Sequence, residues 1–210
     1  MISKKSKEKG VLAIILEKCI KIVLLKECKK IGNIKIDIIA TSFQIINGLI
    51  QKINIIAQDI NYKDIVFDTI KLEANNVKIN FSIYNKEFKF ENTIIIIFKA
   101  SLSEKSLNSF LFSSQWNWIA NRISNEILNQ KKFEAIKIKN NHILMKTPKD
   151  KRGVSEEIKV DIKAEKGGLY LDNKLCNKSI RIPIEKKVCI KDLSIENDSI
   201  NILAISSVEL

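Results

Sequence analysis

The chain has 210 residues and a formal net charge of +12 at pH 7, and 45% of its residues are hydrophobic. This length suits one domain with a real core, and the few glycines (6) and prolines (2) form no stretch typical of a flexible linker. Almost all of the positive charge is lysine, since the only arginines are Arg122, Arg152 and Arg181. Because sequence-specific nucleic-acid readers depend on the arginine fork, this composition argues against nucleic acid as a partner.

The cysteines and the single histidine show no metal-binding pattern. Cys19, Cys28, Cys176 and Cys189 lack the paired spacing of zinc ligands, and His142 stands alone. We expect reduced thiols, no metal and no cofactor.

The N-terminal segment resembles a secretion signal only in its first residues. A basic run precedes six apolar residues, Val11 to Leu16, and Glu17 and Lys18 then interrupt them before a full signal core or a cleavage site appears. The apolar run Ile94 to Phe98 is shorter still, so neither run is long enough to span a bilayer. The sequence therefore predicts a cytoplasmic protein, with a peripheral membrane contact left open.

Periodicity divides the chain into four regions within a single domain, 1–210. We expect a disordered basic tail at 1–10, a helix at 11–31, strands at 34–100, helices at 101–130 and strands at 133–208. The first helix has an unusually wide apolar face and ends at Gly32.

From Ile34 onward, apolar and polar residues alternate as they do in half-buried strands. Asn140-Asn141 and Asn197-Asp198 are among the pairs that predict turns between these strands. The alternation changes phase at Asn75 and Asn76, which predicts a β-bulge and a bend. A long strand is expected from Phe88 to Ala100, with one apolar face.

The middle of the chain reads as helical. Ser101 and Glu104 have the spacing of a capping box, and a second helix carries Trp116 and Ile119 on one face. Trp118 cannot share the direction of Trp116, so we expect it to be more exposed. Clean alternation in the strands favours an antiparallel sheet with one wet face, and thus an α+β fold.

Motifs for catalysis are absent. The sequence contains no GxSxG, GxGxxG, GxxxxGK[ST] or HExxH. Asp59, Asp64 and His142 are the remaining candidates for an enzyme acting on lipid or glycan, and each has the character of a surface or turn residue. We expect no catalytic residues.

Three segments together resemble the LmeA-like phospholipid-binding family. They are Ile45–Gly48 with Ile53–Ile65, then Ile70–Ile79, then the "LN" helix opening at Ser103–Asn108, and the similarity covers roughly residues 11–130. The first helix leading directly into a strand is similar to the cyanobacterial branch of that family. The segment Tyr62–Ile65 departs from the family pattern because it lacks a glycine.

The resemblance implies an elongated, curved antiparallel sheet wrapped around helices, an N-terminal helix with a central helix pair, and an apolar channel for a phospholipid or another acyl-chain lipid. It implies no cofactor and no catalytic residue, and the lysines add an anionic membrane surface as a second partner. The hypothesis assigns lipid contacts to apolar residues of the long strand and the helices: Phe88, Phe90, Ile94, Ile96, Phe98, Leu107, Phe110, Leu111, Trp116, Ile119 and Ile123. The alternative is a scaffolding β-domain without a ligand cavity, whose first helix docks a protein partner.

Overall fold

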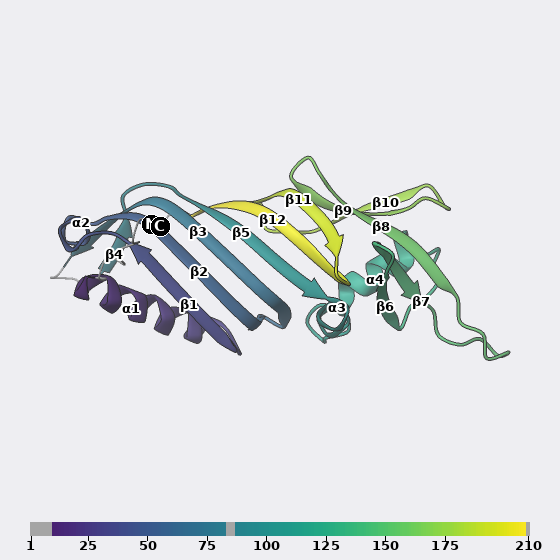
Figure 1. Cartoon of the computed structure of the whole chain (residues 1–210). Coiled ribbons are helices and arrows are strands. Elements are labelled where there is room, and N and C mark those ends of the chain that lie inside the picture. Colours follow the sequence, from purple (N-terminus) through teal and green to yellow (C-terminus); the bar gives the residue numbers. More distant parts are fainter. Residues whose placement is uncertain (1–9, 83–86, 209–210) are drawn as a thin grey trace, which may run out of the picture.

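The structure is a computed structural model, and it describes residues 10–82 and 87–208 (Figure 1). The predicted disordered tail falls outside these residues except for Gly10. The helices are α1 (Val11–Glu27), α2 (Ser42–Ile46), α3 (Glu104–Leu111) and α4 (Asn117–Glu126). The strands are β1 (Asn33–Ile39), β2 (Leu49–Tyr62), β3 (Ile65–Ser82), β4 (Glu87–Phe90), β5 (Ile94–Ser103), β6 (Ala135–Lys139), β7 (His142–Lys146), β8 (Glu157–Glu165), β9 (Gly168–Asn173), β10 (Lys178–Ile182), β11 (Val188–Glu196) and β12 (Ser199–Val208).

The strands form two antiparallel sheets. The first has the order β1-β2-β3-β5-β12-β11, with β4 paired to the far end of β3, and the second has the order β10-β9-β8-β7-β6. Figure 1 shows α1 lying along β1 at one end of the first sheet, while α3 and α4 lie at its other end, beside the second sheet. After the second sheet, the chain re-enters the first sheet in β11 and β12. Strands from the first and the last part of the described sequence therefore belong to the same sheet.

Two-residue turns of Asn, Asp, Lys and Gly connect the β2–β3, β6–β7, β8–β9 and β11–β12 hairpins. Asn140 and Asn141 join β6 to β7 with φ of 51° and 61°, and Asn197 and Asp198 join β11 to β12 with φ of 51° and 54°. Positive φ at both central positions matches the right-handed twist of the flanking strands. The predicted turns at these two sites are confirmed.

The predicted change of phase at Asn75 and Asn76 is confirmed, but the predicted β-bulge is wrong, because the pairing of β2 with β3 has no register shift there. Asn76 has a φ of 53°, and the residues on either side of the irregularity, Ala74 and Val77, are both buried. On β2 the facing residue Ile50 is 2% exposed, and it pairs with Val77. Both strands therefore change face together and their register is kept.

The capping box predicted at Ser101 is wrong. Ser101 lies inside β5, because β5 pairs with β12 as far as Ser103. Ser103 is the N-cap of α3, and its side chain accepts a hydrogen bond from the backbone N–H of Ser106. Glu104 instead accepts a hydrogen bond from the backbone N–H of Ile138, at 3.0 Å, and so links α3 to β6.

The single long strand expected from Phe88 to Ala100 is interrupted. The side chain of Asn92 accepts a hydrogen bond from the backbone N–H of Lys78 at 3.0 Å and donates one to the carbonyl of Asn76 at 3.3 Å. This amide occupies backbone groups that a continuous strand would use, which explains why β4 and β5 are separate strands.

Two groups of buried side chains hold the fold together. The larger one packs α3 and α4 between the second sheet and the ends of β11 and β12, with Ile127 and Val160 fully buried. The smaller one packs α1 against β1, β2 and β3 around Ala13, Ile38 and Val77. We call them the large core and the small core.

The α+β class, the antiparallel pairing and the N-terminal helix are as predicted. The sequence led us to expect one sheet curved around helices, whereas the structure has two open sheets that neither close nor curl. The helices are too short and few to be enclosed by a sheet: α1 has 17 residues and packs along one edge strand, β1.

Candidate functional site

The face of the first sheet that contacts α1 and α3 is apolar across all six strands of its main path; we call it the inner face. Cross-strand pairing aligns side chains in rows at right angles to the strands. One row consists of Ile36, Ile55, Leu72, Phe98, Ala204 and Ile190, and the next of Ile34, Ala57, Ile70, Ala100, Ile202 and Leu193. Neither row carries a polar side chain. A sheet face of this kind is normally covered by another layer of the protein or by a partner.

Four residues near the middle of the inner face form what we call the central strip: Phe67, Ile70, Leu72 and Phe98. All four are half-buried, and neither core contains them within the described part of the chain. The rings of Phe67 and Phe98 meet edge to face, with centroids 6.2 Å apart. The central strip is therefore an apolar surface that lies between the small core and the large core and retains contact with solvent.

The structure distributes the eleven predicted lipid-contact residues over three places. Ile94 and Ile96 belong to the small core, and Phe98 belongs to the central strip. The side chains of Phe88 and Phe90, in β4, lie outside the described residues. The remaining six pack in or against the large core: Leu107, Phe110, Leu111, Trp116, Ile119 and Ile123.

Burial of the helical candidates identifies them as core residues. Ile119, Ile123 and Leu111 are 3%, 1% and 4% exposed, and their neighbours are side chains of this same chain. Trp116 is partly buried and its ring lies 5.3 Å from that of Phe110, whereas Trp118 is 43% exposed, as predicted. These helices hold the second sheet in place.

Sequence reasoning missed three residues of the central strip. Ile70 and Leu72 were visible in the alternating pattern, but their position opposite Phe98 depends on the pairing of β3 with β5. The alternating pattern of β3 did not place Phe67 on the apolar face. The reason is a second change of phase in the β2–β3 pair, near Asp59, whose φ is 52°.

Polar contacts anchor α3 beside the central strip. The Asp68 carboxylate, on β3, accepts hydrogen bonds from the Ser103 backbone N–H and hydroxyl and from the Ser106 hydroxyl, the last at 3.1 Å. Asn108 exchanges two 2.7 Å hydrogen bonds with the backbone of Ile136, on β6. One boundary of the central strip is thus fixed by hydrogen bonds to both sheets.

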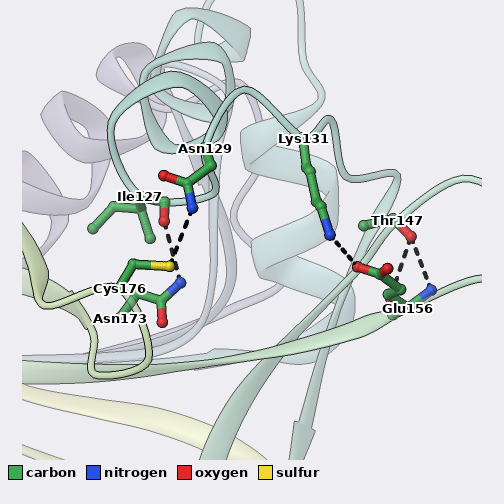
Figure 2. A network of polar contacts seen from close by, with 7 residues as sticks. All are labelled: Ile127, Asn129, Lys131, Thr147, Glu156, Asn173 and Cys176. Atoms are coloured by element: carbon green, nitrogen blue, oxygen red, sulfur yellow. Dashed lines mark hydrogen bonds and ion pairs between the residues drawn. The ribbon is translucent and has the colours of Figure 1, made fainter.

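A second polar network closes the large core at the end of α4 (Figure 2). Asn173 is 2% exposed and donates a 3.2 Å hydrogen bond to the carbonyl of Ile127. Close by, Asn129 donates to the sulfur of Cys176, and Thr147 and Glu156 bond through side chain and backbone. These contacts satisfy buried polar groups and bring no reactive pair together, so we interpret the network as structural.

The opposite face of the first sheet, the outer face, carries charged residues together with exposed apolar residues such as Ile56 and Ile95. An open hollow of about 340 Å³ lies over β1, β2, β3 and β5, and its lining includes Lys35, Asp37, Lys71, Glu73 and Lys99. Hydrogen bonds from Lys52 and Asn75 lower the pKa of Glu73. Lysines and carboxylates alternate there, so this hollow has no single sign of charge with which to select an anion.

The three candidates for an enzyme do not form one site. Asp64 lies in the β2–β3 turn and pairs with Lys29 at 2.6 Å, while Asp59 is exposed within β2. His142 begins β7 in the other sheet, where its Nδ1 lies 3.4 Å from a carboxylate oxygen of Asp161. Among the described residues, no group of three His, Cys, Asp or Glu side chains is arranged to hold a metal ion.

In the part of the chain that the structure describes, none of the helices has both the length and the apolar character needed to cross a membrane. Comparisons of the chain with known protein families, with curated proteins and with solved structures return no match. A functional proposal for this chain therefore depends on the central strip and on the two helices beside it.

Proposed function

We propose that this protein binds a phospholipid or another acyl-chain lipid along the central strip of its inner face. The observation that carries the proposal is the central strip itself: four half-buried apolar side chains, with Leu72 and Phe98 paired at its centre, on strands β3 and β5, which also contact α3, in the same sheet as β1, which packs on α1. A sheet face without polar side chains forms no hydrogen bonds with water through its side chains. Covering it with an acyl chain removes apolar surface of both partners from water, which is favourable.

The resemblance to LmeA-like proteins supports the same ligand class. In this interpretation the first sheet, α1 and α3 together supply the apolar surface that a tubular lipid-binding fold would provide, with the lipid shared between helix and sheet. The side chains of the central strip are half-buried and not enclosed, so a bound lipid would keep one side toward solvent or toward a membrane. A peripheral role in lipid transfer fits such an arrangement.

The length of the ligand follows from its energetics. Each buried methylene contributes about 0.8 kcal/mol, so ten would contribute about 8 kcal/mol. Association itself costs about 4–15 kcal/mol in lost freedom. We therefore expect measurable affinity only for long acyl chains, of the length found in membrane lipids.

The first experiment is native mass spectrometry of the purified full-length protein, which should show bound lipid. A fatty acid carrying a photoreactive diazirine should then crosslink to peptides that contain the central strip, within β3 and β5. Crosslinking only to other peptides, or none at all, would overturn the proposal in favour of a scaffolding domain without a ligand.

A matched pair of variants sharpens this test. Leu72→Glu places a charge in the central strip, and Ile97→Glu places the same charge on the outer face of the neighbouring strand β5. We expect binding of a fluorescent long-chain fatty acid to fall at least tenfold in Leu72→Glu and to stay within twofold in Ile97→Glu. Circular dichroism checks that both variants fold, and equal losses in the two would contradict the assignment of the face.

A further inference from the structure

The outward side of α1 is apolar. Among the residues of this helix, Ala13 is the buried one. Val11, Ile15 and Ile22 are 72%, 51% and 54% exposed, and Ile14 and Leu25 are 40% and 48% exposed. Their spacing of three, four and seven residues puts them on one stripe, opposite the side that packs on β1. A helix that is apolar on both sides is ordinarily enclosed, whereas this stripe is exposed in the described part of the chain.

The short helix α2 adds two exposed apolar residues beside the start of α1. Gly10, just before α1, lies against Ser42 at the start of α2, and the two helices pack together. Phe43 and Ile46 on α2 are 76% and 74% exposed. We call the combined surface, made of Val11, Ile14, Ile15, Ile22, Leu25, Phe43 and Ile46, the apolar stripe.

The charges around the apolar stripe have one sign. Lys18 falls within it, and Lys21 and Lys26 flank it; all three are exposed. The carboxylates of α1 lie away from it: Glu17 accepts a 3.0 Å hydrogen bond from the backbone N–H of Ile38, on the sheet side, and Glu27 is the last residue of the helix. The nine residues that precede Gly10 add four lysines and one glutamate, Glu8, so their net charge is also positive.

We propose that the apolar stripe docks on an anionic membrane, with α1 and α2 lying in the plane of the headgroup layer. Exposed Ile, Val, Leu and Phe side chains bordered by lysine are the composition of interfacial helices, whose apolar side enters the boundary between headgroups and acyl chains. A protein partner would more often be met by an apolar centre with arginine and aromatic anchors. The choice of lipid as partner rests on the proposed function, because docking would place the central strip beside its source of lipid.

The experiment is flotation of the full-length protein with two kinds of vesicle, phosphatidylcholine alone and an equal mixture of phosphatidylcholine and phosphatidylglycerol. We expect at least tenfold more protein on the mixed vesicles at 0.1 M NaCl, and a clear decrease at 0.5 M because salt screens the lysines. Equal flotation on both kinds, or on neither, would overturn the proposal.

Two matched sets of variants test the surface itself. Ile15→Ser with Ile22→Ser and Phe43→Ser removes the apolar stripe, and we expect a loss of at least tenfold in flotation. Val154→Ser with Leu175→Ser removes exposed apolar residues elsewhere, 60% and 86% exposed, and should leave flotation within twofold. Hydrogen exchange of the unmodified protein should show protection of α1 and α2 when mixed vesicles are added, whatever the variants do.

Two further readouts separate the outcomes. If the stripe variant turns a dimer into a monomer in sedimentation velocity and the unmodified protein does not float, the surface joins two copies of the chain and the membrane proposal is wrong. Fatty-acid binding by the stripe variant should be unchanged. Loss of flotation with fatty-acid binding retained therefore concerns the apolar stripe alone, whereas absent fatty-acid binding with flotation intact contradicts only the proposed function.

Discussion

The indole N–H of Trp116 donates a 2.7 Å hydrogen bond to the backbone carbonyl of Lys63. Lys63 sits at the tip of the β2–β3 hairpin, and Trp116 immediately precedes α4, 53 residues later in the chain. This bond fastens the far end of the longest hairpin to the helix pair that supports the second sheet. It is therefore a joint between the first sheet and the large core.

Trp116→Phe should weaken that joint. The ring still packs on Phe110, so the expected loss is one hydrogen bond, about 1 kcal/mol in the free energy of unfolding measured with urea. Trp118→Phe is the control: Trp118 is 43% exposed, and its replacement should change stability by less than about 0.5 kcal/mol. Equal effects of the two changes would contradict this role for the Trp116 bond.

Asn76 lies at the position where β3 changes the face on which its buried residues lie. Its φ of 53° suits asparagine or glycine and is unfavourable for a β-branched residue. We expect Asn76→Val to lower stability by about 1–2 kcal/mol, and Asn76→Gly to stay within about 1 kcal/mol of the unmodified protein. Thermal unfolding followed by circular dichroism measures both, and a Val variant as stable as the Gly variant would show that the irregularity is not needed.

Replacing Ile123 distinguishes a role in core packing from a role in lipid contact. With 1% exposure, Ile123→Ala should create a cavity and cost about 2–5 kcal/mol in urea unfolding. Leu175→Ala, at a residue 86% exposed, should cost little. Fatty-acid binding by the folded Ile123→Ala protein should remain within twofold; a binding loss without a stability loss would instead return Ile123 to the lipid site.

Asp161 provides a pH dependence with a defined sign. The Lys174 ammonium, 2.7 Å from its carboxylate, lowers the pKa of Asp161 against the opposing effect of burial. The unfolded chain then takes up this proton at a higher pH than the folded chain does, so the contribution to stability exists above the ordinary Asp pKa of about 3.9 and is lost as pH falls below it.

Urea midpoints at pH 6 and pH 3 measure this loss. We expect Lys174→Met to reduce the difference between the two midpoints, and Lys151→Met, which removes an exposed lysine from the loop between β7 and β8, to leave it unchanged. If both variants behave like the unmodified protein, the Lys174 contact does not govern Asp161.

Much of the local structure was predictable from the sequence. Apolar residues at every second position predicted strands such as β8. Asn140-Asn141 and Asn197-Asp198 predicted turns, because alternation and positive φ are properties of a few neighbouring residues. The change of phase at Asn76 was predictable for the same reason.

The candidate site depended on distant parts of the chain. Phe98 faces Leu72 because β5 pairs with β3, and β5 ends at Ser103 because β12, nearly a hundred residues away, continues the ladder. Nothing in the local pattern around Phe67 predicted that its ring would meet that of Phe98. Lipid contacts were accordingly assigned to helical residues that the structure places in the large core.

The N-terminal helix shows most clearly which properties follow from the sequence and which from the tertiary structure. The sequence by itself predicted a helix over residues 11–31 with an unusually wide apolar face, and the structure ends this helix at Glu27. Only the tertiary structure decided which side is covered: the small side chain of Ala13 allows close approach to the sheet, and the stripe from Val11 to Leu25 is left outward. Helix formation depends on neighbours four residues apart, whereas burial depends on strands that the rest of the chain must first bring together.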